Sequence, residues 1–195
     1  MLMNAHFLIA KSLFENIDPN KSFFLSEKNF IYGNLKPDSS SKYVFKKHYL
    51  NESLEYIISK INYLCSLNLD TLPRYFSVSK FSQELGVICH FLCDFFCVPH
   101  SKRWEFKHSM KKHMLYEKEL SIVAKETNLS GFKGDIVTND NFEEFFYELY
   151  NEYINKLDYK NDLLFSSYMC NSAINYILDS ILRNTVNSYD VLKFI

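Results

Sequence analysis

One stretch of this sequence, residues 85–100, most constrains the fold, because it is apolar almost all round yet contains ionisable side chains. His90 and Asp94 are four residues apart, so one helical turn brings both side chains onto the same stripe. Pro99 is expected to stop the helix, and His100 follows at once. A buried aspartate is costly unless it is paired or bound to a cation. The stretch therefore predicts a buried helix with either a structural His–Asp hydrogen bond or a metal site.

The rest of the chain is typical of an all-α protein with a single domain over residues 1–195. Only 4 Gly and 4 Pro accompany 14 Tyr and 18 Phe, which favours long helices packed with aromatic side chains. Apolar residues at helical spacing predict helices over 4–17, 51–67, 77–98, 102–126, 141–157 and 162–184. Residues 21–41 are expected to be irregular because 32–38 is rich in turn formers, and 129–139 is expected to be a loop.

Composition and charge exclude little. The net charge of −1 gives no global argument for binding nucleic acid or an anionic membrane. Basic residues crowd locally, and such runs are usually solvated helix faces, although they could also steer an anionic substrate. They are Lys42, Lys46, Lys47, Lys102, Arg103, Lys107, Lys111 and Lys112.

The compartment is expected to be the reducing cytoplasm. Residues 1–17 lack a basic start, and their apolar run 7–10 is too short for a signal-peptide core. No apolar run approaches the roughly 18 residues of a transmembrane segment. The five cysteines are odd in number and lack the Cys-x2-Cys spacing of a zinc-thiolate site, so we expect small buried hydrophobic residues rather than a disulfide framework.

Eight side chains, spread over several segments of the sequence, have the chemistry of metal ligands. Two of them, His113 and Glu117, repeat the four-residue spacing of His90 and Asp94. The eight candidates are His6, Asp38, His48, His90, Asp94, His100, His113 and Glu117. Each alone has a simpler explanation, such as a surface residue, a helix cap, a turn or an exposed ion pair. Imidazole and carboxylate together favour hard-to-borderline ions, zinc first. His108 has Lys112 four residues later and is interpreted as a surface residue.

The ordered set of these residues resembles the zinc-dependent phospholipase C family, which includes the catalytic domain of clostridial alpha-toxin and shares its all-helical fold with fungal single-strand nucleases. The resemblance runs from His6 to Glu117. It is carried by Ala5-His6-Phe7-Leu8-Ile9-Ala10, Gly33-Asn34-Leu35-Lys36-Pro37-Asp38, His48, Leu85-Gly86, His90-Phe91-Leu92-Cys93-Asp94, Pro99-His100 and His113-Met114-Leu115-Tyr116-Glu117.

The resemblance implies two or three zinc ions. Asp38, His48, His90 and Asp94 would surround one ion, with Asp38 acting partly as a base on water. His100, His113 and Glu117 would hold a second ion, and His6 with Asp94 a third, so that Asp94 bridges two ions. The relatives use an N-terminal Trp at the third ion, whereas the only Trp here is Trp104. Since His6 lies five residues after Met1, a neutral terminal amine could fold back and serve as a ligand.

The leading hypothesis is a zinc-dependent phosphodiester hydrolase resembling phospholipase C, which uses metal-activated water on a phosphodiester such as a phospholipid head group. A hydrolase of this kind could also make transient contact with a membrane surface. The alternatives are a nuclease-like phosphodiesterase acting on nucleic acid, a catalytically silent metal-binding protein, and a helical protein whose histidines are incidental.

Overall fold

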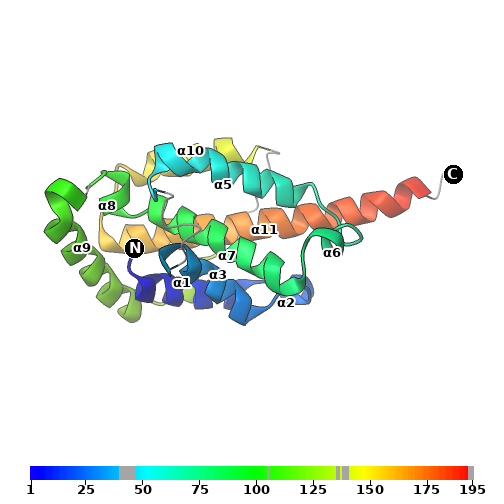
Figure 1. Cartoon of the computed structure of the whole chain (residues 1–195), viewed down its shortest axis with the longest axis horizontal. Coiled ribbons are helices and arrows are strands. Elements are labelled where there is room, and N and C mark those ends of the chain that lie inside the picture. Colours follow the sequence, from blue (N-terminus) through cyan, green and yellow to red (C-terminus); the bar gives the residue numbers. More distant parts are fainter. Residues whose placement is uncertain (40–46, 105, 135–136, 138–140, 193–195) are drawn as a thin grey trace.

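The computed structural model describes residues 1–39, 47–104, 106–134, 137 and 141–192, and these are helical without a strand, which confirms the all-α class. Figure 1 shows the helices as an elongated bundle. The elements are α1 (Met3–Asn16), α2 (Pro19–Ser22), α3 (Glu27–Ser39), α5 (Leu50–Cys65), α6 (Leu72–Tyr75), α7 (Val78–Phe95), α8 (Val98–Ser101), α9 (Phe106–Glu126), the 3-10 turn η1 (Leu129–Gly131), α10 (Phe142–Tyr153) and α11 (Tyr159–Leu192).

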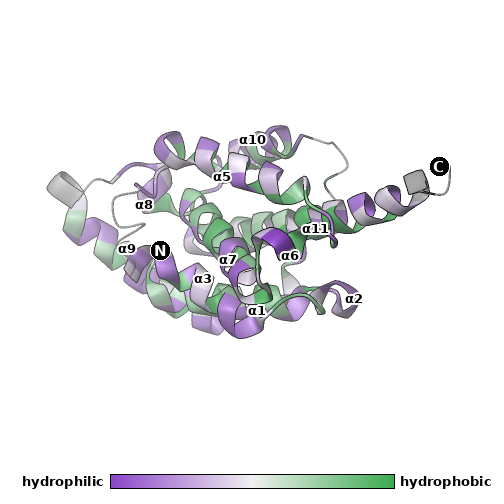
Figure 2. Ribbon diagram, turned by 45° about the vertical axis from the view of Figure 1, so that its right-hand side comes forward, coloured by the Kyte–Doolittle hydropathy of each residue, from purple (hydrophilic) through white to green (hydrophobic). Residues whose placement is uncertain are grey.

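Helix α7 forms the centre of the bundle and packs against α3, α5, α11 and α1. Ser77 caps its first turn by accepting a hydrogen bond from the Lys80 backbone N–H. Every residue from Glu84 to Phe95 is buried, as expected for a segment that is apolar almost all round. Figure 2 shows apolar residues concentrated on α7, with hydrophilic residues on peripheral helices such as α10. His90 and Asp94 therefore lie in the interior of the protein.

The expectation that residues 21–41 are irregular is wrong for most of this stretch, because Glu27–Ser39 forms helix α3 despite Gly33 and Pro37, and residues 40–41 lie outside the described ones. The cause is tertiary packing, which overrides local propensity. A Cβ on Gly33 would lie 2.3 Å from the Gln83 carbonyl oxygen, so only glycine allows α3 to approach the α7 backbone this closely. Asp38 is consequently held on a helix rather than on a loop.

Several helix boundaries also differ from expectation. Helix α7 ends at Phe95 rather than at residue 98, and Pro99 lies in the first turn of the separate helix α8 instead of stopping a longer one. Proline is well tolerated there because that turn leaves backbone N–H groups unbonded anyway. Helix α11 is longer at both ends than 162–184. The expected loop 129–139 begins with the η1 turn, and 135–136 and 138–139 lie outside the described residues.

All five cysteines are free thiols, and four of them are buried, in agreement with the interpretation as small hydrophobic residues. Within the described part of the chain, the helices are all too short or too polar to cross a membrane.

Candidate metal centre

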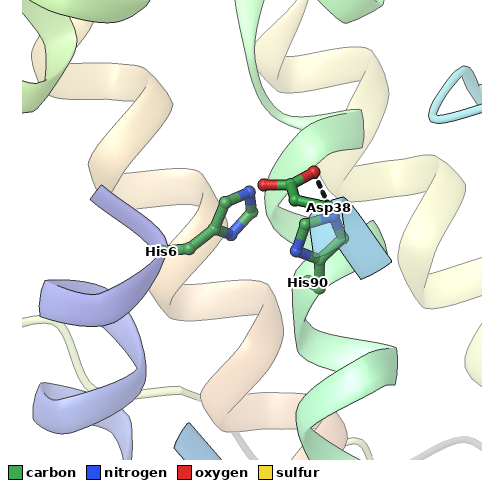
Figure 3. A group of neighbouring side chains, drawn as sticks. All are labelled: His6, Asp38 and His90. Carbon is green, nitrogen blue, oxygen red and sulfur yellow. Dashed lines mark ion pairs between the residues drawn. The ribbon is translucent and has the colours of Figure 1, made fainter. Parts of the chain in front are cut away.

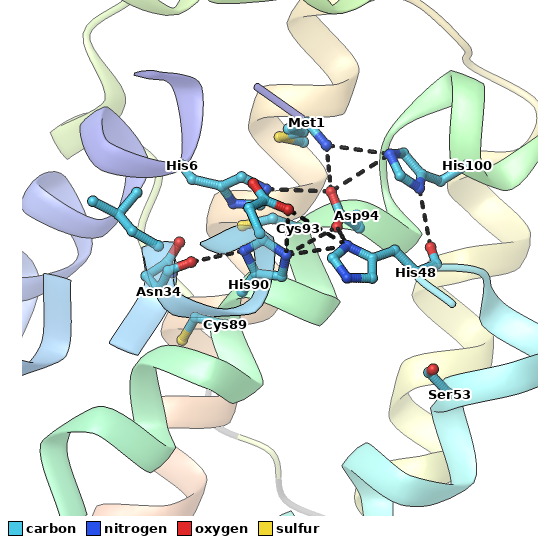
Figure 4. A network of polar contacts seen from close by, with 12 residues as sticks. Met1, His6, Asn34, His48, Ser53, Cys89, His90, Cys93, Asp94 and His100 are labelled. Carbon is cyan, nitrogen blue, oxygen red and sulfur yellow. Dashed lines mark hydrogen bonds and ion pairs between the residues drawn. The ribbon is translucent and has the colours of Figure 1, made fainter. Parts of the chain in front are cut away.

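All eight sequence-predicted ligand residues come together at one end of the bundle, near the N-terminus. His6 comes from α1, Asp38 from α3, His48 from the segment before α5, His90 and Asp94 from α7, His100 from α8, and His113 and Glu117 from α9. Figures 3 and 4 show how side chains from distant segments converge there. The remaining histidine, His108, has a side chain outside the described ones, so its interpretation as a surface residue stays a prediction.

Asp94 is fully buried and lies at the middle of the cluster. Its Oδ2 atom is 2.7 Å from His48 Nδ1 and 3.2 Å from His90 Nε2. Its Oδ1 atom is 3.3 Å from His6 Nε2 and 3.7 Å from His100 Nε2. The two oxygens of one carboxylate therefore face different groups of histidines, which is the arrangement that a bridging ligand needs (Figure 4).

A second group of donors lies between α8 and α9. Glu117 Oε1 is 3.1 Å from His100 Nε2 and 2.9 Å from His113 Nε2. Burial alone would raise the pKa of Glu117, but the nearby amine of Met1 and hydrogen bonds from the two histidines hold it below its usual value. Glu117 is therefore an ionised carboxylate with an imidazole on either side.

Three of the histidines are oriented by backbone carbonyls, which only accept hydrogen bonds. Their Nδ1–H groups therefore donate, and Nε2 faces the carboxylates of the cluster. His90 donates to the Asn34 carbonyl over 2.7 Å, His100 to the His48 carbonyl over 3.1 Å, and His113 to the Trp104 carbonyl over 3.1 Å. This second layer of contacts is typical of metal-binding histidines.

His6 is the clearest sign that the cluster is incomplete without a ligand. Its ring is fully buried and stacks on His90 with 4.0 Å between centroids. Among the described residues, Nδ1 has no hydrogen-bond partner, and Nε2 has only the 3.3 Å contact with Asp94 Oδ1, which is not a well-formed hydrogen bond. Burial and the neighbouring His90 lower the pKa of His6 to about 3, so the ring is neutral and can donate a lone pair. A buried imidazole whose nitrogens lack well-formed hydrogen bonds is unfavourable in an apolar interior unless it binds a ligand.

The Met1 amine is also buried among these groups. It contacts Asp94 Oδ1, and it lies 3.1 Å from Glu117 Oε1 and 3.2 Å from His100 Nε2. Burial alone would lower the pKa of this amine, but Asp94 and Glu117 raise it well above its usual value. Burial would likewise raise the pKa of Asp94, which the amine and the histidines instead hold well below its usual range. Two ionised carboxylates therefore draw a cation into the interior.

The donor set fits a cation-binding centre of more than one site. The donor atoms form three groups, and within each group they lie within 4.8 Å of one another. The groups are His6, Asp38 and His90; His48, His90 and Asp94; and Cys97, His100 and Glu117. Figure 3 shows the first group, in which Asp38 Oδ1 is 3.6 Å from His90 Nε2. The sequence predicts Cys97 as a small buried hydrophobic residue, and Cys97 is indeed buried. Its position three residues before the candidate ligand His100 is the sequence feature that points to a place in the cluster.

Above the cluster lies an open pocket of about 680 Å³. Asp38 lines it with a half-buried side chain, together with Lys47 and Tyr49. Asp38 Oδ1 is 3.9 Å from His48 Nδ1, so this carboxylate is held more loosely than Asp94. Sequence reasoning gave Tyr49 no role, because an aromatic residue beside a candidate ligand has no distinctive pattern.

Asp162 of α11 is a further buried carboxylate that the sequence did not single out. It accepts hydrogen bonds from the Val98 backbone N–H at 3.0 Å and from the Tyr153 hydroxyl at 2.8 Å. Burial raises the pKa of Asp162 to about 7. Because Val98 begins α8, this contact fixes the short helix that carries His100. Asp162 therefore supports the cluster without belonging to it.

Fold and cluster together define a helical protein in which a buried carboxylate is surrounded by histidines, beside a surface pocket. The model of a family described as zinc dependent phospholipase C matches residues 5–160, which include all eight candidate ligands, and the chain belongs to this family. The family is one of zinc-dependent hydrolases, and the match gives no support to the nucleic-acid alternative. No curated protein and no solved structure matches the chain.

Proposed function

We propose that this protein is a zinc-dependent phosphodiester hydrolase that acts on a phospholipid head group. The observation that carries the proposal is the position of Asp94, a fully buried carboxylate whose two oxygens face two different sets of histidines. The family match over residues 5–160 supports zinc as the metal. Zinc ions held here would supply Lewis acidity, which lowers the pKa of water and polarises a phosphoryl oxygen.

The ligand roles follow the grouping of the donors. Asp38, His48, His90 and Asp94 would hold one ion, and His100, His113 and Glu117 a second. His6 and Asp94 would hold a third, at the position that the Met1 amine approaches. The carbonyl contacts of His90 and His100 keep Nε2 directed into the cluster and so fix ligand geometry before a metal binds.

Asp38 is the residue that we assign to proton transfer. It lines the pocket, and its shortest contacts to His90 and His48 are 3.6 and 3.9 Å, too long for a strong hydrogen bond. A loosely held carboxylate at the pocket can orient the attacking water and accept its proton. Lys47 lines the same pocket and offers a positive charge to the phosphate anion.

Zinc content and turnover, measured on the same preparations, test this proposal. We expect at least two zinc ions per chain by elemental analysis, and hydrolysis of a chromogenic phosphocholine diester that a chelator abolishes. Single-stranded DNA serves as the comparison substrate and is expected to be left intact. Asp38→Asn should lower turnover by roughly a hundredfold while most of the zinc remains.

Asp70→Asn is the matched control, because Asp70 is an exposed aspartate whose carboxylate accepts a hydrogen bond from the Tyr189 hydroxyl of α11. It should change neither zinc content nor turnover. Full zinc content without turnover on any phosphodiester would identify a catalytically silent metal-binding protein. Less than one zinc per chain after growth with zinc would rule out the proposed centre.

A further inference from the structure

An exposed apolar groove runs along α9 beside α1, at the end of the bundle that holds the N-terminus (Figure 1). It has a volume of about 620 Å³ and is lined by Leu2, Met110, Lys111, Met114, Leu115 and Lys118. Met110 and Leu115 expose 47% and 51% of their surface, although both are large apolar residues. Met3 and Phe7 are further exposed apolar residues, four residues apart on α1, which packs against α9.

The pattern of this face differs from that of an ordinary solvated helix. Met110 and Met114 are four residues apart, so they form one stripe on α9, and Lys111, Leu115 and Lys118 form the stripe beside it. Contiguous apolar side chains with basic neighbours are typical of helices that lie at the surface of a lipid layer.

The charges that line the groove have one sign. Both of its charged residues, Lys111 and Lys118, are basic. A lysine can lay its aliphatic stem along apolar surface and extend its ammonium group to an anion. The face therefore complements a partner that offers phosphate anions above an apolar layer.

The groove is continuous with the pocket of the candidate metal centre. Leu2 and Met114 line both cavities, and Met114 directly follows the candidate ligand His113. A layer of lipid seated on the groove would thus present its head groups at the edge of the pocket that contains Asp38.

We infer that this α1–α9 face, formed by Leu2, Met3, Phe7 and the groove residues of α9, docks the enzyme on the surface of a phospholipid layer that contains anionic lipid. The apolar side chains enter the boundary between head groups and acyl chains, and the two lysines contact phosphates. The inference rests on the proposed function for its choice of partner, since a phosphodiester hydrolase of lipids must reach head groups in an aggregate.

Flotation of the zinc-loaded protein with vesicles tests the inference directly, because binding is measured without turnover. One set of vesicles is phosphatidylcholine alone, and the other is equal parts phosphatidylcholine and phosphatidylglycerol. We expect preferential binding to the mixed vesicles, weakened by salt. Lys111→Gln with Lys118→Gln should lower that affinity roughly thirtyfold, from the contribution of a lysine near an anionic surface. Met110→Ser with Leu115→Ser should lower affinity for both vesicles roughly tenfold.

Matched controls lie at the other end of α3 and α7. Val78→Ser removes an apolar residue that is 49% exposed, and Lys28→Gln removes an exposed lysine. Both should leave vesicle binding unchanged. Hydrolysis of a soluble chromogenic diester should be unchanged in all four variants, and thermal unfolding checks that each variant is folded.

The outcomes separate this inference from the proposed function. Vesicle binding with the expected variant pattern but no hydrolysis of any diester supports the docking face and contradicts the proposed function. Binding that the two α9 double variants leave intact, or that the controls weaken equally, overturns the docking face. So does loss of soluble-substrate turnover in those double variants, which would make the groove part of the catalytic pocket. A dimer that Met110→Ser with Leu115→Ser dissociates, with vesicle binding unchanged, identifies the face as a contact between copies and also overturns it.

Discussion

Gly86 is the position where the fold and the candidate centre are most directly linked. A Cβ at Gly86 would lie 2.2 Å from the Phe30 carbonyl oxygen and 2.6 Å from the Asn34 nitrogen, both backbone atoms of α3. Ordinary contacts of a Cβ begin near 3.4 Å. Gly86→Ala can therefore be accommodated only if α3 moves away from α7 by more than an ångström, because no side chain can rotate to make room.

Two opposing effects set the size of the change. Alanine stabilises a helix interior by about 1 kcal/mol relative to glycine. Overpacking a core costs about 1–3 kcal/mol, and a clash between two backbones belongs at the upper end of that range. The net expectation is a loss of about 2 kcal/mol, which lowers the melting temperature by roughly 4–8 °C for a chain of this size.

The same displacement should also disturb the centre. Asn34 belongs to the part of α3 that would move, and its carbonyl orients His90 through a 2.7 Å hydrogen bond. Loss of such an outer contact lowers metal affinity about tenfold to a hundredfold. Gly86→Ala should thus weaken zinc binding and turnover beyond what the modest loss of stability explains.

Urea and thermal unfolding, together with zinc competition against a coloured chelator, measure both effects. Gly131→Ala is the matched control, because a Cβ there has no atom within 4 Å and its φ is not positive. It should be neutral or slightly stabilising, by less than about 1 kcal/mol. If Gly86→Ala proves as stable as Gly131→Ala and retains wild-type zinc affinity, the close approach of α3 and α7 does not orient the centre.

Three further expectations follow from buried groups. Asp94→Asn should lose at least one zinc ion and nearly all turnover. Glu84 is a buried carboxylate on the same helix, and Glu84→Gln should keep both zinc and turnover. Equal losses of zinc in the two variants, measured by elemental analysis, would contradict a bridging role for Asp94. The pKa of His6 is about 3 in the folded protein and about 6.5 in the unfolded chain. Between these pH values only the unfolded chain binds this proton. The free energy of unfolding of the metal-free protein should therefore fall by about 1.4 kcal/mol for each unit by which the pH is lowered. His6→Gln should remove this pH dependence from the free energy of unfolding, measured in urea at several pH values. If the slope against pH is the same in the variant and the wild type, His6 is not its source. Asp162→Ala should destabilise the protein by about 3 kcal/mol, because the Val98 N–H and the Tyr153 hydroxyl lose their hydrogen-bond acceptor. It should also weaken zinc binding at His100. An unfolding midpoint equal to that of the wild type would show that Asp162 does not stabilise α8.

Much of the bundle could be predicted from the sequence, because its helices have strong apolar periodicity or are buried throughout. Helix α5 was placed within two residues at each end, since its buried residues recur every third or fourth position. Helix α3 was missed because Gly33 and Pro37 are the residues that usually punctuate loops. Prediction of α3 fails for a physical reason. Local sequence patterns reflect the conformational preference of the backbone, whereas α3 is stabilised by contact with α7, about fifty residues later.

The candidate ligands were readable for a related reason. Imidazole and carboxylate side chains at four-residue spacing in an apolar helix are too costly to be there without a partner. The contacts that aim those side chains left no such signal. Backbone carbonyls such as those of Asn34 and Trp104 carry no sequence information, and Asp162 is separated from α8 by about sixty residues.

Helix α3, which local sequence patterns do not predict, and the orientation of the His90 ring depend on the same two glycines. Gly33 and Gly86 have no side chain between α3 and α7, and the resulting close approach is what brings the Asn34 carbonyl within 2.7 Å of His90 Nδ1. That contact fixes the tautomer of His90 and turns its Nε2 toward Asp94. Gly33 weakens α3 as an isolated helix, and Gly86 does the same to α7. These two glycines are therefore the residues that allow the buried carboxylate to be shared among histidines.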